Sequence, residues 1–168
     1  MLGDLKYSEI TVPERLLLNE GDVLFNRTNS WEHVGRTGVW RGQLEKATFA
    51  SYLVRLNPQP GMLLSELLNI WLNWEPTQIA MRRQATPAVQ QVNINPTSLR
   101  SIPAAFPGSL DEQREMVKRF ASMRLTIRST IESLRKLHHL KSGLMHDLLT
   151  GKRRVTPLLA AETSQPDV

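Results

Sequence analysis

The most informative part of the sequence reads Gly21-Asp-Val-Leu-Phe-Asn-Arg-Thr-Asn29 and continues, after a short gap, as Val34-Gly-Arg36. Gly21 and Asp22 form a turn pair, and the three apolar residues that follow predict a short buried strand at 23–25. Polar side chains that gather where a strand ends often form a binding edge, because a rigid scaffold positions the loops that carry function. The candidate contact residues of this edge are Asn26, Arg27, Thr28, Asn29 and Arg36.

Outward from this stretch, short strand-like segments mix with helical segments and show no βαβ rhythm. Runs of β-branched and aromatic residues indicate strands, and apolar residues at steps of three and four indicate a helix that Pro76 ends or kinks. The pattern predicts an α+β fold, with a small mixed α/β domain over 1–108. The expected strands lie at 23–25, 34–40, 48–56, 88–94 and 102–106, the expected helix at 62–74, and a helix N-terminus or turn at 95–98.

A second region begins at Ser109, after which 110–149 contains no proline and a single glycine, Gly143. This composition predicts one long C-terminal helix over 109–150, close to 60 Å long at about 1.5 Å per residue. Its apolar residues recur mostly at steps of three and four, interrupted by Arg124, which is typical of a coiled-coil seam or a helix-hairpin face. The remaining 151–168 are expected to form a basic helix stop and a flexible tail. The helix-packing candidates are Val117, Phe120, Ile127, Ile131, Leu134, Leu137 and Leu144.

Charge and composition narrow the classes of function. The net charge is +5, and 111–154 hold 11 Lys and Arg against 5 Asp and Glu, a local net charge of +6. Such a balance is compatible with a polyanionic partner such as double-stranded DNA. The absence of cysteine excludes a disulfide framework, and no apolar run is long enough for a membrane span. The sequence therefore predicts a soluble, cytoplasmic protein without membrane contact.

Motifs for catalysis and metal binding are missing from the sequence. Neither standard glycine-rich phosphate loop is present, nor is a Gly-x-Ser-x-Gly elbow. The four histidines, His33, His138, His139 and His146, are not joined by carboxylates in a metal-ligand pattern. We therefore expect a binding protein with no catalytic residues, no metal and no cofactor of its own.

Two further groups of polar residues could contact nucleic acid. One follows the middle helix, and the other lies in the strand expected at 88–94. Arginine suits guanine edges and phosphates, whereas asparagine and glutamine suit adenine. Each residue also has an ordinary structural interpretation, since Asn and Thr form turns and Arg occupies surfaces. The candidates are Arg82, Arg83 and Gln84 in the first group, and Gln90, Gln91 and Asn93 in the second.

Five motifs in order resemble the type I restriction–modification specificity subunits. The opening stretch resembles the start of a target-recognition domain in that family, and Phe49-Ala-Ser-Tyr-Leu-Val-Arg-Leu56 resembles its next core strand. Gln91-Val-Asn-Ile-Asn95 with Leu99-Arg-Ser-Ile-Pro103 is similar to the closing strand and turn. Asp111-Glu-Gln-Arg114 resembles the start of the spacer helix, and Leu140-Lys-Ser-Gly-Leu-Met-His-Asp-Leu-Leu-Thr-Gly-Lys-Arg-Arg-Val155 resembles its end. The resemblance covers about Tyr7 to Val155.

The resemblance implies a role in DNA recognition. In that family each recognition domain reads one half of a split DNA sequence, and the long helices form an antiparallel coiled coil that spaces the half-sites. The subunits are not catalytic: the modification subunits, which bind S-adenosylmethionine, and the restriction subunits perform the chemistry.

This sequence departs from the family pattern because it holds one recognition domain and one spacer helix instead of two of each. It also begins late in the recognition domain. We therefore expect a half-length, N-terminally shortened specificity subunit whose helix pairs with a second copy, or with another specificity chain, to read a split site. The alternative is a protein-interaction module or gene remnant that docks on a methyltransferase or an intact specificity subunit without reading DNA.

Overall fold

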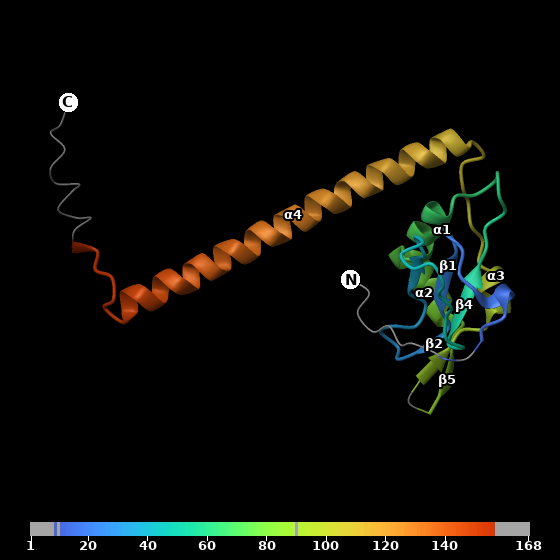
Figure 1. The fold of residues 1–168 in the computed structure, drawn as a ribbon, viewed down its shortest axis with the longest axis horizontal. Helices are drawn as coiled ribbons and strands as arrows, with labels where there is room; N and C mark the ends of the chain where they lie inside the picture. Colours follow the sequence, from blue (N-terminus) through green and yellow to red (C-terminus); the bar gives the residue numbers. More distant parts are fainter. Residues whose placement is uncertain (1–8, 10, 90, 157–168) are drawn as a thin grey trace. The chain divides into compact units, whose positions relative to one another are not determined.

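A computed structural model describes residues 9, 11–89 and 91–156 of the chain (Figure 1). Small antiparallel sheets and short helices precede one long C-terminal helix, which confirms the predicted α+β class. Contacts divide the chain between Lys118 and Arg119 into two compact units, so the first turns of the long helix belong to the N-terminal unit.

The first sheet has three antiparallel strands in the order β3-β1-β4. Its strands are β1 (Val23–Asn26), β3 (Thr37–Val39) and β4 (Leu53–Leu56). Val23 and Phe25 are fully buried, which confirms the strand predicted at 23–25. The strands expected at 34–40 and 48–56 are shorter than predicted, because Val34 and Gly35 lie in a turn and β4 begins only at Leu53.

The second sheet joins segments that are far apart in the chain, in the order β2-β6-β5. Its strands are β2 (Thr28–Asn29), β5 (Thr86–Ala88) and β6 (Gln91–Asn93), and Thr28 pairs with Asn93. The prediction of one strand over 88–94 is wrong, because β5 and β6 pair as antiparallel neighbours. Val89, an apolar residue of that run, is 93% exposed and lies in a turn instead of the core.

Four helical segments surround the sheets, namely η1 (Glu14–Leu16), α1 (Ser65–Leu72), α2 (Glu75–Arg83) and α3 (Pro96–Arg100). α1 confirms the predicted middle helix and packs against β3 and β1. Pro76 lies in the first turn of α2, where its missing N–H costs no helical hydrogen bond.

The strand expected at 102–106 is absent, and the described chain is irregular there. The apolar residues of this segment pack instead of pairing. The Phe106 ring meets the Trp71 ring edge to face at a centroid distance of 5.6 Å, and Ile102 packs against the core. Pro103 and Pro107 also lack the N–H groups that a sheet ladder requires.

One core connects the two sheets with the helices. It is built from strand residues, from Val34 in the turn before β3, from Ile94 just after β6, and from the inward faces of α1, α2 and α3. The same cluster contains residues of both sheets, so the strands on each side of the link between β1 and β2 pack on one core. The buried residues of this cluster are Val23, Phe25, Val34, Leu72, Met81, Val92, Ile94 and Leu99.

Arg55 in β4 holds the segment that precedes the first sheet. Its guanidinium donates to the backbone carbonyls of Leu17 and Arg15, at 2.7 Å each. It also pairs with the Asp22 carboxylate at 3.2 Å and lies 5.8 Å from the centre of the Phe49 ring. The Arg55 and Asp22 side chains are only 21% and 10% exposed, so this network is largely shielded from water.

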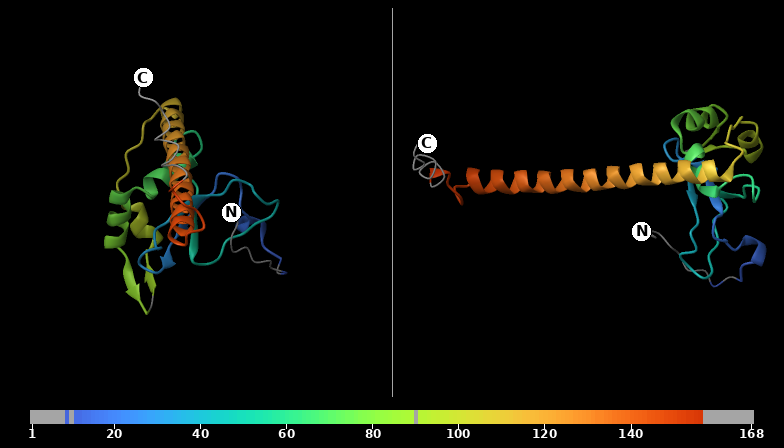
Figure 2. Two further views of the ribbon diagram at one scale, coloured as in Figure 1. Left: turned by 90° about the vertical axis from the view of Figure 1, so that its left-hand side faces the viewer. Right: turned by 90° about the horizontal axis from the view of Figure 1, so that it is seen from above.

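The long helix α4 (Leu110–Leu149) has 40 residues. The right-hand view of Figure 2 shows it as one unbroken helix. Gln113, in its first turns, is fully buried and uses its whole side-chain amide. Its Nε2 donates to the carbonyls of Pro107 and Met62 at 2.7 and 2.8 Å, and its Oε1 accepts from the Leu64 N–H at 3.0 Å. None of the helices in the described part of the chain is both long and apolar enough to cross a membrane.

Candidate nucleic-acid interface

The chain passes from one sheet to the other at a single residue, Arg27, which lies between the end of β1 and the start of β2. Its N–H donates to the Tyr52 carbonyl at 3.0 Å, and its own carbonyl accepts from the Ile94 N–H at 2.8 Å. The backbone of Arg27 is thus bonded on one side to the segment that leads into β4 and on the other to the residue that follows β6. These two hydrogen bonds fix the position of the Arg27 Cα, from which the side chain extends.

An open hollow of about 510 Å³ lies beside this crossing. It brings together three of the predicted contact residues, Arg27, Thr28 and Asn29, with Gln91 from β6. Ser51 and Tyr52, just before β4, complete the lining and were not predicted. Both residues fall in the strand expected at 48–56. In the structure both are exposed, and Tyr52 is 49% exposed.

Two of the three asparagines at this edge, Asn29 and Asn93, have their carbonyl oxygens engaged. The Asn29 Oδ1 accepts from the Ser30 N–H at 2.8 Å, and the Asn93 Oδ1 accepts from the Thr28 hydroxyl at 2.9 Å. Within the described part of the chain, by contrast, the Arg27 guanidinium makes no hydrogen bond, and its Nε is buried without a partner. Since Asn26 is likewise left with a buried, unpaired Oδ1, the crossing carries unsatisfied polar groups.

Arg36 and Arg82 belong to a neighbouring arrangement around the turn at Gly35. This glycine has a φ of 84°, which favours glycine, and a Cβ placed on it would crowd the Gln78 Oε1 at 3.2 Å. Gln78 of α2 donates to the Gly35 carbonyl at 2.8 Å and to the Leu72 carbonyl at 2.6 Å. Arg82 is half-buried and donates weakly to Gln78 at 3.4 Å, whereas the Arg36 side chain is exposed.

The turn at 30–33 adds an acidic group to this surface. Hydrogen bonding with its own backbone, and then with Ser30, lowers the pKa of the Glu32 carboxyl, and electrostatic interactions with His33 and Arg82 act in the same direction. Glu32 therefore stays ionised, and the surface is not uniformly basic. Trp31, in the same turn, is 52% exposed.

The remaining predicted contact residues are scattered. Arg83 is exposed at the end of α2 and does not line the hollow, and Asn93 is half-buried in β6. Gln90 lies outside the described residues. Among the described residues, no three or more His, Asp or Glu side chains lie close enough together to hold a metal ion.

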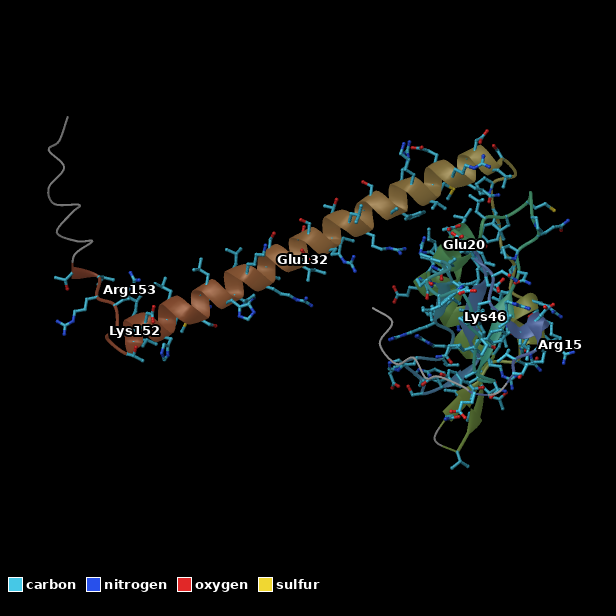
Figure 3. The ribbon with its side chains drawn as sticks, in the orientation of Figure 1. Arg15, Glu20, Lys46, Glu132, Lys152 and Arg153 are labelled. Carbon is cyan, nitrogen blue, oxygen red and sulfur yellow. The ribbon has the colours of Figure 1, made fainter. Side chains whose placement is uncertain are left out.

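The helix-packing candidates lie on α4, and all except the half-buried Val117 are exposed, from 40% for Phe120 to 62% for Leu137. Within the unit that starts at Arg119, basic side chains far outnumber the described acidic ones, Glu132 and Asp147. Figure 3 shows Lys152 and Arg153 just beyond the end of the helix, where Lys152 pairs with Asp147 at 3.4 Å.

Comparison with known proteins places this geometry in context. No family model matches the chain. It is similar, at 28% identity over 147 residues, to a protein of Methanocaldococcus jannaschii named "Putative type I restriction enzyme MjaX specificity subunit". The alignment covers 88% of this chain and 34% of that protein, so the chain spans about a third of the length of the relative. This similarity confirms the resemblance to type I restriction–modification specificity subunits that the motifs between Gly21 and Val155 predicted.

Proposed function

We propose that this chain is a DNA sequence-recognition element of a type I restriction–modification system and has no catalytic activity of its own. The observation that carries the proposal is the fixed crossing at Arg27, whose guanidinium bonds to no described residue and lies beside Thr28, Asn29 and Gln91 in one open hollow. A rigid scaffold with donor side chains at its edge is suited to base edges and phosphates. The similarity to a named specificity subunit points in the same direction.

The proposed partners follow from this role. They are double-stranded DNA in the cytoplasm, a modification subunit that supplies S-adenosylmethionine, and a restriction subunit. The exposed stripe of α4 supports a further proposal, namely that the helix pairs with a second copy or with another specificity chain. Two copies joined in this way would present two recognition domains to a split site.

DNA binding by the full chain should weaken steeply as salt rises, because each neutralised phosphate releases counterions. Replacing Arg27 or Arg36 by alanine should lower the affinity for duplex DNA, by about 5-fold to 100-fold for a residue that contacts a base. Fluorescence anisotropy with duplexes at several salt concentrations measures both effects. Arg41→Ala is the matched control, since Arg41 is exposed and does not line the hollow. Equal affinity and sequence preference in all four proteins would disprove the assignment of the site.

Self-association through α4 should be visible by sedimentation at micromolar concentration. Ile131 and Leu134 are 44% and 53% exposed and lie on the apolar stripe, so the double change to glutamate should abolish a dimer. Glu132→Gln, on the same helix but off the stripe, should leave the dimer intact. A wild-type chain that sediments as a clean monomer at this concentration would rule out the pairing.

The exposed stripe also favours a second function, in which α4 docks on a methyltransferase or an intact specificity subunit and the chain does not read DNA. Gel shifts on random-sequence duplexes, with and without the modification subunit, separate the two. A shift by the chain alone supports direct recognition, and a shift that requires the modification subunit and survives Arg27→Ala supports docking.

A further inference from the structure

We infer that the hollow at Arg27 reads the major-groove edge of a guanine, so that each half-site recognised by this chain contains a G·C pair contacted by Arg27. The inference rests on the proposed DNA recognition and names the base that the site selects. It follows from two groups of the hollow: the Arg27 guanidinium, which donates to no described residue, and the Thr28 hydroxyl, whose hydrogen is already donated to Asn93.

Asn29 and Asn93 each have one acceptor position of the side-chain amide already used within the protein. A bidentate contact with adenine needs one amide to donate to N7 and accept from the N6 amino group. The Oδ1 of Asn29 accepts from the Ser30 N–H and that of Asn93 from the Thr28 hydroxyl, so each oxygen keeps one of its two lone pairs for a ligand. The choice of guanine therefore rests on Arg27.

Arg27 offers the complementary pattern to guanine. Guanine presents two acceptors, N7 and O6, to the major groove, and an arginine fork can donate to both at once. The Arg27 backbone is held by both sheets, and no described residue accepts a hydrogen bond from its guanidinium. A side chain on a fixed backbone loses less conformational entropy when it binds, which favours a directional contact.

Thr28 fits the base on the opposite strand. Its hydroxyl hydrogen is directed to Asn93, so the hydroxyl can only accept from a ligand. In a G·C pair the cytosine amino group is a donor that lies beside the guanine O6. Neighbouring residues of one hollow thus supply two donors and an acceptor, which is the set that complements a G·C pair. Gln91 lines the same hollow, and its amide, which bonds to no described residue, suits an adenine beside the G·C pair.

The test uses the full chain and a consensus duplex that wild-type protein selects from a randomised duplex library. Each guanine of the consensus is then replaced, one at a time, by 7-deazaguanine, which removes the N7 acceptor and leaves base pairing and phosphates unchanged. We expect one guanine in each half-site at which the analogue weakens wild-type binding by about 5-fold to 100-fold. Arg27→Gln should bind more weakly and should show no further loss with the analogue, because the contact is already missing.

Arg41→Gln is the control and should retain the full effect of the analogue, since it changes the same charge outside the hollow. A consensus without a sensitive guanine, or an analogue effect of equal size in Arg27→Gln, would overturn the inference while DNA recognition stands. If Arg27 instead contacts a phosphate, Arg27→Gln will weaken binding uniformly across sequences and lower the salt slope by about one. Wild-type chain that selects no duplex would overturn both this inference and the proposed function. The analogue series on wild-type protein needs no variant, so misfolding of Arg27→Gln leaves the base contact testable.

Discussion

Replacing Gln113 by leucine should lower the free energy of unfolding by roughly 3 to 5 kcal/mol, because it removes three hydrogen bonds of a fully buried side chain to partly buried backbone groups. The leucine fills a similar volume but leaves the carbonyls of Met62 and Pro107 and the N–H of Leu64 without their partner. Each buried group that loses its partner costs about 1 to 3 kcal/mol. Urea denaturation followed by circular dichroism measures the loss.

Two companion variants show whether the hydrogen bonds cause the effect. Gln113→Glu keeps the size and the acceptor but loses both donated bonds, so it should be destabilised nearly as much as the leucine variant. Arg114→Ala, one residue along on the exposed side of α4, breaks only a surface ion pair with Asp111 and should change stability by less than about 1 kcal/mol. Similar stabilities for all three variants would show that Gln113 does not hold the start of the helix.

Replacing Arg55 by methionine should cost roughly 2 to 4 kcal/mol, since it leaves two backbone carbonyls unpaired and removes the cation beside the shielded Asp22 carboxylate, which then keeps only the Asn19 N–H as a partner. The loss should be local at first: limited proteolysis should cut the segment around Arg15 before the rest of the domain unfolds. Arg55→Lys should recover only part of the stability, because a single ammonium group cannot replace a planar fork with three acceptors.

A double-mutant cycle with Asp22→Asn separates the ion pair from the carbonyl contacts. We expect the coupling energy between Arg55 and Asp22 to be smaller than the total cost of Arg55→Met, because two of the three contacts do not involve the carboxylate. Arg41→Met, at an exposed position, controls for the loss of charge. A cost for Arg55→Met no larger than that of the control would contradict the proposed network.

The long elements of the fold could be predicted from sequence because their patterns repeat. Burial alternates along 23–26, apolar residues recur through α1, and α4 runs without a break for 40 residues. Segments of two or three residues could not be predicted, because β2 is too short to show any period. The strand expected at 102–106 was wrong because an apolar run does not distinguish strand pairing from side-chain packing. Phe106 packs against Trp71 and Ile102 against the core.

The site was predictable only in part. Arg27, Thr28 and Asn29 were found because polar residues follow an apolar strand directly, and the resemblance to known specificity subunits pointed to the same stretch. Ser51 and Tyr52 reach the hollow through tertiary pairing near Arg27, which no local pattern reveals. The importance of Gln113 was hidden too, since its partners lie 6, 49 and 51 residues away along the chain.

The hydrogen bonds that fix Arg27 have a consequence for how this protein could change its target. They involve only backbone groups, an N–H donated to Tyr52 and a carbonyl offered to Ile94, so any residue except proline can form them. The scaffold therefore does not depend on which side chain stands at position 27. Another residue can therefore replace Arg27 without loss of these backbone hydrogen bonds, and only proline would remove one of them.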